Sequence, residues 1–303
     1  MFNVIGHKNI FFGISTAFIV LSIVSMLVFG FRLGVDFTGG TLWQIKIPGT
    51  DAQKLEEFFR SNLGLQVSGI AFDRASDIYA VTLPEIPDSD RQIHFGTIEK
   101  NFSGAEDFDF QRISPSVSKE LRSKSITAVI LVMVVISLYI AFVFRKVSRP
   151  VSSWKYGIIT LITLAHDVII PAGVFAILGN FIGVAVDSNF IVALLMVMGF
   201  SVHDTIVVFD RIRENLRKNV GQNFEDTVEK SIRQTLMRSI FTSMTVIVVL
   251  ISLLAFGGPT THYFSLTLLL GITFGTYSSI FLASPLLVSW NKRSEKKRVK
   301  KNR

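Results

Sequence analysis

The chain of 303 residues contains no cysteine and only five histidines, and charged side chains make up just 18% of it. Without cysteine it can have neither a disulfide framework nor a thiolate metal site. The sequence is rich instead in apolar residues, since 49% are hydrophobic and the mean hydropathy is +0.48. Several apolar runs approach the ~20 residues that cross a bilayer as a helix, which indicates a polytopic membrane protein and not a soluble fold.

Six runs are apolar enough and long enough to form membrane-spanning helices. They lie at residues 10–31, 125–144, 156–178, 190–209, 240–256 and 264–290. The first run is longer than the hydrophobic core of a signal peptide, and no small-residue cleavage site follows it, so we expect it to be retained as an anchor. The sequence therefore predicts a membrane protein with an all-α bundle of six transmembrane helices.

Lysine and arginine are distributed unevenly among the loops. They cluster after the second run, after the fourth run and in the tail at 292–303, whereas the loops at 179–189 and 257–263 contain neither. Cationic loops tend to stay in the cytoplasm, so we expect both termini to be cytoplasmic and the polar segment at 34–124 to be extracytoplasmic. This topology, with the basic tail against anionic membrane lipid, explains the net charge of +8, and we expect no nucleic acid partner.

The polar segment at 34–124 has the pattern of a small α+β domain. Alternating residues predict strands at 41–47, 66–72, 78–83 and 108–113, and helical spacing predicts helices at 51–62 and 89–101. The order β-α-β-β-α-β is that of a ferredoxin-like domain. Between Arg32 and Lys124 it holds 14 acidic and 11 basic residues, with no catalytic or metal-ligand grouping. We therefore expect a binding or mechanical module, no metal, no cofactor and no enzyme activity.

Two glycines mark the entry to this domain. The segment 34–40 reads GVDFTGG, and its last residues, Gly39 and Gly40, permit backbone conformations that other residues avoid. A phosphate-binding glycine loop would be followed by a helix, and here a strand is predicted instead. We interpret Gly39 and Gly40 as a turn or hinge where the chain leaves the membrane.

These patterns predict a division of the chain into six parts. The parts are the cytoplasmic N-terminus with the first span (1–33), the extracytoplasmic domain (34–124), the second to fourth spans (125–209), a cytoplasmic amphipathic connector (210–238), the fifth and sixth spans (239–290) and a basic cytoplasmic tail (291–303). In the connector, apolar residues recur every fourth position from Phe224 to Leu236, which suits a helix that lies on the membrane surface or against its neighbours.

Ionisable residues inside the spans are the strongest indication of function. Asp204 lies in the fourth run, and Asp167 lies in the third, each directly after a histidine, His203 or His166. A carboxylate at the centre of a spanning helix costs about 2.5 to 3.5 kcal/mol on insertion, so we expect it to face other helices. Neighbouring residues on a helix point about 100° apart, so we expect only one member of each pair to face the bundle.

Arg238, at the start of the fifth run, is the candidate partner of Asp204. Burial favours the neutral form of a carboxylate, and a nearby guanidinium favours the charged form. An Asp204 that gains and loses contact with Arg238 would therefore alternate between holding and releasing a proton. One charge that crosses 100 mV releases about 2.3 kcal/mol, which is enough to bias two conformations.

Four stretches of this sequence together resemble the SecF family of bacterial protein-export subunits. They are GVDFTGG at 34–40, AHDVIIP at 165–171, GFSVHDTIVVFDRIREN at 199–215 and SIRQTLMRSIFTSMTVIVVLISLLAFGG at 231–258. The likeness covers residues 1 to about 290 and preserves the order of the motifs. It implies a six-helix half of the resistance-nodulation-division superfamily, in the bacterial cytoplasmic (inner) membrane.

The resemblance implies partners and roles that the residues alone do not. The partners would be SecD, the SecYEG channel, YajC and the preprotein, which the complex helps to pull across the membrane with the proton-motive force. The family's ion-coupling aspartate and arginine fall on Asp204 and Arg238. Asp167 occupies a family motif position with either a coupling or a packing role, the parts of His166 and His203 stay open, and the coupling ion is a proton or sodium.

Two other functions fit the intramembrane charges less well. An intramembrane aspartyl protease would use two carboxylates such as Asp167 and Asp204, but its GxGD pattern is absent, and an arginine partner would oppose the shared proton that catalysis needs. A small-molecule exporter half of the same superfamily would carry larger external insertions than the single small domain predicted here.

Overall fold

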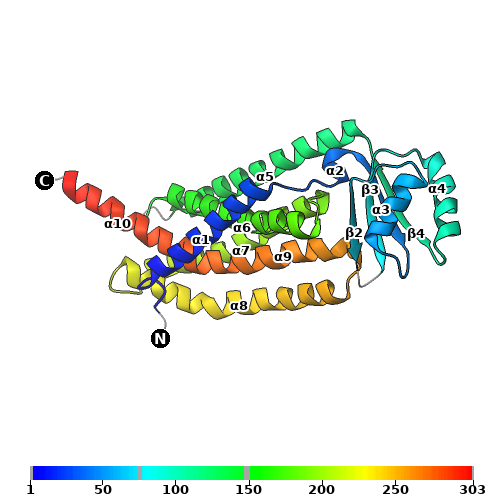
Figure 1. Ribbon diagram of the computed structural model, residues 1–303. Coiled ribbons are helices and arrows are strands. Elements are labelled where there is room, and N and C mark those ends of the chain that lie inside the picture. Colours follow the sequence, from blue (N-terminus) through cyan, green and yellow to red (C-terminus); the bar gives the residue numbers. More distant parts are fainter. Residues whose placement is uncertain (1–2, 74–76, 147–150, 302–303) are drawn as a thin grey trace.

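The protein consists of a bundle of long helices with a small sheet domain at one end (Figure 1). The computed structural model describes residues 3–73, 77–146 and 151–301. Both ends of the chain lie at the end of the bundle that is remote from the sheet domain (Figure 1). This arrangement is the one that an even number of membrane crossings requires.

Six helical segments are long and apolar enough to cross a membrane, as the sequence predicts. Five are single helices: α1 (Lys8–Phe29), α5 (Pro115–Val143), α6 (Ser153–Ile182), α7 (Ser188–Arg217) and α8 (Phe224–Phe256). The sixth is α9 (Pro259–Ser278), which continues through a π-helical turn, η2 (Ser279–Ala283), into α10 (Ser284–Lys301). Two short elements complete the helical part, α2 (Val35–Thr38) and the 3₁₀ turn η1 (Phe144–Lys146).

The helices extend beyond the apolar runs that predicted them. Helix α5 begins at Pro115, ten residues before the predicted start of the second span, because the polar residues in between are also helical. Residues 210–238 are not a separate connector: their first part completes α7, and their second part begins α8 at Phe224. The apolar stripe packs against other helices, since Val228 and Ile232 are fully buried in the main core cluster. An apolar run shows which part of a helix lies in the lipid. The helix itself can continue into the polar residues on either side, because its backbone hydrogen bonds do not depend on apolar side chains.

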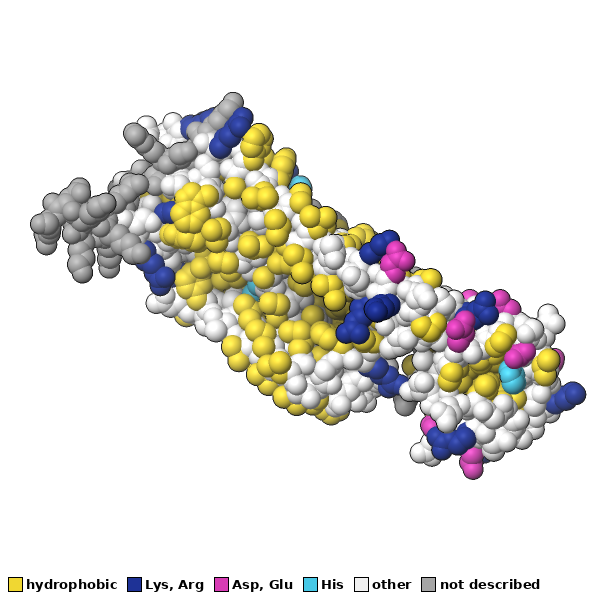
Figure 2. Space-filling view, turned by 90° about the horizontal axis from the view of Figure 1, so that it is seen from above, with side chains coloured by type: hydrophobic (Ala, Val, Ile, Leu, Met, Phe, Trp, Pro, Cys, Tyr) yellow, Lys and Arg dark blue, Asp and Glu magenta, His cyan; other side chains and the backbone are white. Residues whose placement is uncertain are grey.

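Helix α6 lies at the centre of the bundle. It contacts α1, α5, α7 and α9, and more than half of its apolar segment is buried within the chain. Close approach is possible because glycines face its neighbours: a Cβ on Gly173 would lie 2.3 Å from Ser22 Cβ of α1, and one on Gly157 would lie 2.5 Å from the Ser137 carbonyl oxygen of α5. By contrast, α1, α5 and α8 bury little of their apolar segments within the chain, as lipid-facing helices do. Figure 2, seen from the side of α5, shows hydrophobic side chains over much of the bundle surface.

The sheet domain has the predicted ferredoxin-like order. Its strands are β1 (Gly40–Lys46), β2 (Gly69–Asp73), β3 (Ile78–Leu83) and β4 (Glu106–Ile113), with α3 (Ala52–Ser61) after β1 and α4 (Asp88–Asn101) after β3. They form an antiparallel sheet in the order β2-β3-β1-β4. Trp43, Phe59 and Tyr79 are among the buried residues of the core between the sheet and its helices. The opposite face of the sheet turns toward the bundle.

The glycine pair forms the turn between α2 and β1. Gly39 has φ +77° and Gly40 has φ +119°, both in the region that favours glycine. A Cβ on Gly40 would also lie 2.5 Å from the Leu83 carbonyl oxygen, so this position has no room for a side chain. Just before the turn, a parallel bridge between Leu33 and Val186 ties the chain after α1 to the loop between α6 and α7. The segment that leads into the sheet domain is therefore held by main-chain hydrogen bonds to the loop between α6 and α7.

Candidate ion-coupling site

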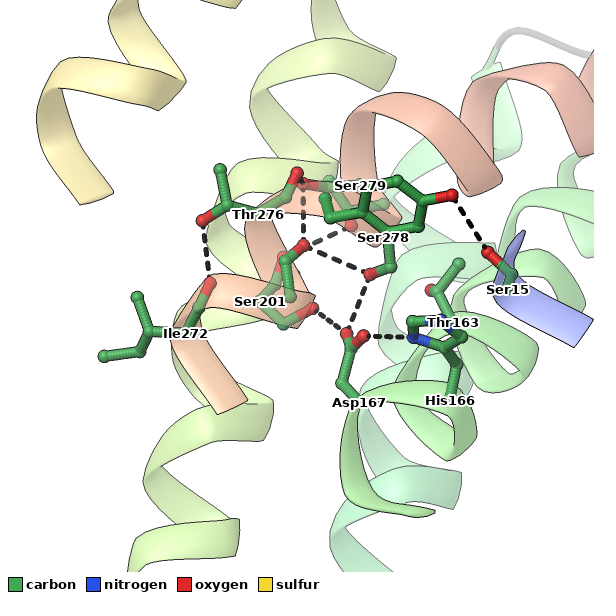
Figure 3. A network of polar contacts seen from close by, with 12 residues as sticks. Ser15, Thr163, His166, Asp167, Ser201, Ile272, Thr276, Ser278 and Ser279 are labelled. Atoms are coloured by element: carbon green, nitrogen blue, oxygen red, sulfur yellow. Dashed lines mark hydrogen bonds and ion pairs between the residues drawn. The ribbon is translucent and has the colours of Figure 1, made fainter. Parts of the chain in front are cut away.

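The buried polar residues of the bundle gather where α6, α7, α8 and α9 meet. The first of two carboxylates is that of Asp167 on α6, which is fully buried (Figure 3). Its Oδ2 accepts hydrogen bonds from Ser201 Oγ of α7 at 2.5 Å and from Ser278 Oγ of α9 at 2.9 Å. Its Oδ1 lies 2.8 Å from His166 Nδ1 (Figure 3). Asp167 is thus held by groups from three helices.

The second carboxylate, that of Asp204 on α7, faces α8 and α9. Only 2% of Asp204 is exposed, so it is buried as predicted. Ser243 Oγ of α8 donates to its Oδ2 at a long 3.4 Å, and the same hydroxyl lies 2.6 Å from Thr276 Oγ1 of α9. His203 Nδ1 is 3.8 Å from Asp204 Oδ1, and 59% of the His203 side chain is exposed. Asp204 therefore has looser partners than Asp167 and an exposed imidazole beside it.

The two His-Asp pairs differ in a way that the sequence did not indicate. In the pair on α7, the aspartate faces the bundle and the histidine faces outward, as helical geometry predicts. In the pair on α6, His166 and Asp167 are both fully buried, so the prediction that only one member faces the bundle is wrong there. The reason is the central position of α6, which has neighbours on several sides. The His166 ring stacks on Tyr277, and its Nε2 atom has no partner among the residues that the structure describes.

Arg238 is not at the site in this conformation. Its side chain is exposed, and no hydrogen bond or ion pair joins it to Asp204 or to any other described residue. Ser239, the next residue, and Ser243, one turn further along α8, are both buried, and Ser243 Oγ contacts Asp204 of α7. Arg238 therefore lies on a different side of α8 from the hydroxyl that meets Asp204. The proposed exchange of a proton for a guanidinium stays a prediction, and it requires α8 to turn or an outside partner to participate.

Several residues of the site were missed by sequence reasoning. Ser201 lies three positions before Asp204 on α7, while Thr276 and Ser278 lie in the sixth apolar run. Hydroxyl residues are common in spanning helices, because they can donate to a carbonyl one turn earlier, so their presence alone carries little information. The available signal was the spacing of Ser201 and Asp204, which places both on one face of α7. Gly275 completes the packing, since a Cβ there would lie 3.0 Å from Ser201 Cβ.

The site can bind a proton or a small cation only through these carboxylates and hydroxyls. Within residues 3–73, 77–146 and 151–301, no group of three or more His, Asp and Glu side chains could hold a metal ion. The charge on each aspartate is offset by hydroxyl donors and an imidazole, with no guanidinium or ammonium group within ion-pair distance. Burial of this kind penalises the charged form and makes the protonation state sensitive to small movements of the donors.

Comparison with known proteins shows the family of this chain. Residues 95–293 match the family described as "Protein export membrane protein SecD/SecF, C-terminal", and residues 24–46 match the "SecD/SecF GG Motif". The chain belongs to the SecD/SecF family. The glycine motif spans Gly39 and Gly40, and the larger match contains both buried aspartates and Arg238.

Relatives in this family align over nearly the whole chain. A protein translocase subunit SecF of Thermobaculum terrenum is 44% identical over 97% of this chain and 95% of its own length. SecF of Anaerolinea thermophila is 35% identical over 96% of this chain and 94% of its own length. A protein translocase subunit SecDF of Thermus thermophilus is 30% identical over 90% of this chain, but over only 36% of its own length.

Solved structures of SecDF confirm the fold. The crystal structure of SecDF, a translocon-associated membrane protein from Thermus thermophilus, matches 96% of this chain with a TM-score of 0.84 and 30% identity. A SecDF crystal structure in a super-membrane-facing form matches 99% with a TM-score of 0.69 and 29% identity. This chain spans 39% and 40% of those two chains. The six-helix bundle with one ferredoxin-like domain is therefore a known SecD/SecF architecture.

Proposed function

We propose that this SecD/SecF-family protein is the SecF-type subunit of a bacterial protein translocase, and that it couples an ion gradient to preprotein export. The observation that supports the coupling is Asp204, a carboxylate buried between α7, α8 and α9 whose hydrogen bond from Ser243 is a long 3.4 Å. A carboxylate that takes up and releases an ion must have hydrogen bonds weak enough to break and re-form. Relatives named as translocase subunits over the full length of the chain favour export over a small-molecule exporter.

Protonation of Asp204 would alter the contacts at the junction of α7, α8 and α9. Charged Asp204 accepts from Ser243, whose hydroxyl also meets Thr276, so the charged form links α8 and α9 to α7. A proton on the carboxylate removes that charge and weakens the link. It also removes any attraction for Arg238, which lies a little more than one turn before Ser243 on α8. The two protonation states thereby favour different positions of α8, and the bundle moves as the ion crosses.

We propose that the movement of the bundle is transmitted to the sheet domain. This domain is joined to the bundle through the Gly39–Gly40 turn and through the hydrogen bond that Arg32 Nη2, after α1, donates to the Ser68 carbonyl oxygen of the domain. No hydrolytic site is needed, because the energy would come from the ion gradient. The ion is a proton or sodium, and no cofactor takes part.

The proposed partners follow from the family. SecDF relatives carry a larger chain of which this one matches 36%, so the companion is a SecD chain that supplies the remainder. The exposed apolar faces of α1, α5 and α8 leave room for such a companion as well as for lipid. We further propose that the complex works beside SecYEG and YajC on preproteins in the cytoplasmic membrane, with both termini in the cytoplasm.

The function is tested by depleting the protein in a host cell and measuring two activities. Export of a secreted reporter should slow, and export should recover when the chain is supplied together with its SecD. Resistance to toxic small molecules should not change. Loss of resistance with normal export would instead support the exporter alternative.

A further inference from the structure

A cavity of about 520 Å³ lies between the sheet domain and the bundle. One wall is the helix-free face of the sheet, where Leu42, Gln44 and Ala80 point away from the domain core. The opposite wall is formed by helix ends and loops at this end of the bundle. It includes Arg32 to Gly39, the loop from Gly183 to Asn189, and His262 to Phe264. A volume in the range of about 300–1,000 Å³ is typical of binding sites.

An unpaired amide lines this cavity. Gln44 on the central strand β1 is only 6% exposed, and its Oε1 is buried without a hydrogen-bond partner. Neither atom of the amide is bonded to any part of the chain that the structure describes. A buried polar group without a partner costs about 1 to 3 kcal/mol. The glutamine side-chain amide has an oxygen that accepts and a nitrogen that donates hydrogen bonds. It therefore complements a ligand group that has both a donor and an acceptor.

The charges around the cavity favour a neutral occupant. Arg32 reaches across it, and its Nη2 makes only a long 3.5 Å hydrogen bond to the Ser68 carbonyl. Asp36 and Asp187 lie on the bundle wall of the cavity, where their carboxylates accept from the backbone amides of Ser188 and Phe190. Burial raises the pKa of Asp187, and the charge of Asp36 raises it further. Two carboxyl groups beside one guanidinium make a poor site for a phosphate headgroup.

Strand β2, at the edge of the sheet, has main-chain groups that could bind a ligand. Among the residues that the structure describes, strand β2 pairs only with β3, and it contributes Gly69, Ala71 and Phe72 to the cavity wall. An edge strand has unpaired N–H and C=O groups that can pair with another extended chain. At Ala71 and Ala80 the wall carries only methyl side chains, beside the larger Leu42 and Phe72. Recognition of this kind depends on the backbone of the ligand and is independent of its sequence.

We propose that the cavity between the sheet and the bundle binds an extended stretch of the exported polypeptide, through the Gln44 amide and the free edge of β2. The inference rests on the proposed function and assigns a substrate-holding site to this chain. A peptide group supplies the donor and the acceptor that Gln44 lacks, and it carries no net charge. A site that recognises only main-chain groups can bind substrates that have no common amino-acid sequence.

Photo-crosslinking in cells that contain the whole complex tests the proposal. A photoreactive amino acid replaces Ala80 in the cavity or, as the control, exposed Ser103 on the helix side of the domain. The probe is a secreted polypeptide stalled by a folded domain at its C-terminal end. We expect an adduct between position 80 and the stalled polypeptide, and none from position 103.

A pair of glutamine variants separates binding from folding. Gln44→Met keeps the length of the side chain but removes the amide, and exposed Gln92→Met on α4 is the matched control. The adduct from position 80 should fall about two- to tenfold in Gln44→Met, the factor expected for one hydrogen bond, and should not change in Gln92→Met. The melting temperature of purified Gln44→Met should stay equal or rise, because no intramolecular bond is lost. A lower melting temperature would show that the amide serves folding.

The remaining outcomes are distinguishable. If position 80 crosslinks only to SecD, to lipid or to nothing while export still depends on this chain, the substrate site is refuted and the proposed function stands. If the cells export equally well without the chain, the proposed function itself fails.

Discussion

Asp167 and Asp204 are both buried carboxylates, but their surroundings suit different roles. Asp167 is held by two short serine hydrogen bonds and an imidazole, and its helix is enclosed by neighbours. Asp204 has a single long serine contact and lies beside an exposed histidine. A tightly held group resists exchange, whereas a loosely held one can change its proton and its partners. We therefore assign packing to Asp167 and ion coupling to Asp204.

Asp167→Asn tests the packing role. The amide keeps one acceptor toward Ser201 or Ser278 but loses the charge, so the free energy of unfolding should fall by about 1 kcal/mol. Export should keep its dependence on the membrane potential. The melting temperature of the purified complex and the export rate with and without an uncoupler measure the two effects. Loss of potential-dependent export at normal stability would show that Asp167 also couples the ion.

Sequence reasoning located the carboxylates but not their partners. The cost of a charge inside an apolar run predicted that Asp204 is buried, and it is. The same reasoning paired it with Arg238, which is exposed here, because a cation near the end of a span can point outward without a large penalty. Ser201, Thr276 and Ser278 were missed, since a hydroxyl side chain in a spanning helix costs little wherever it faces. Their role depends on which helices meet, and one sequence does not contain that information.

At the level of helices, the packing of α6 determines where the site residues lie. Glycines allow α1 and α5 to approach it so closely that both members of its His-Asp pair become buried. Sequence periodicity predicted the number and approximate centres of the spans. It did not predict that α6 is central, because its apolar residues continue around the helix and its contacts come from distant segments. The polar ends of α5, α7 and α8 were assigned to the sheet domain and to a separate amphipathic connector, although they continue the membrane-spanning helices.

Gly173→Ala tests the close contact between α6 and α1. The added Cβ would lie 2.4 Å from Ser22 Cα, so the backbones must separate, which costs about 1 to 3 kcal/mol. We expect a lower melting temperature and less protein in the membrane. Gly13→Ala on α1 is the matched control, because a Cβ there meets nothing within 4 Å. Equal melting temperatures for the two variants would contradict this packing.

At the level of the whole molecule, both termini lie at one end of the bundle and the sheet domain lies at the other (Figure 1). The distribution of Lys and Arg predicted the same arrangement and assigned the termini to the cytoplasm. The ferredoxin-like order of the domain was also predictable, since its strands alternate and its turns are marked. The cavity beneath the sheet was not, because it depends on how the domain is placed on the bundle.

The orientation can be tested directly, because the chain has no cysteine of its own. Single cysteines at Ser103 in the sheet domain and at Asn219 between α7 and α8 provide a matched pair. A maleimide that cannot cross the membrane should label Ser103→Cys in intact cells and should label Asn219→Cys only after the membrane is opened. The opposite pattern would invert the proposed orientation.

The central claim, that Asp204 couples ion movement to protein export, is tested most directly by the export rate measured with and without a membrane potential. Cells or vesicles with wild-type protein, Asp204→Asn, or the control Asp210→Asn, at an exposed position on the same helix, are compared at equal protein levels. We predict that the potential accelerates export in the wild type and in Asp210→Asn. In Asp204→Asn, export should stay at the rate that the wild type shows without a potential. A potential-dependent acceleration in Asp204→Asn equal to that of the wild type would contradict the account.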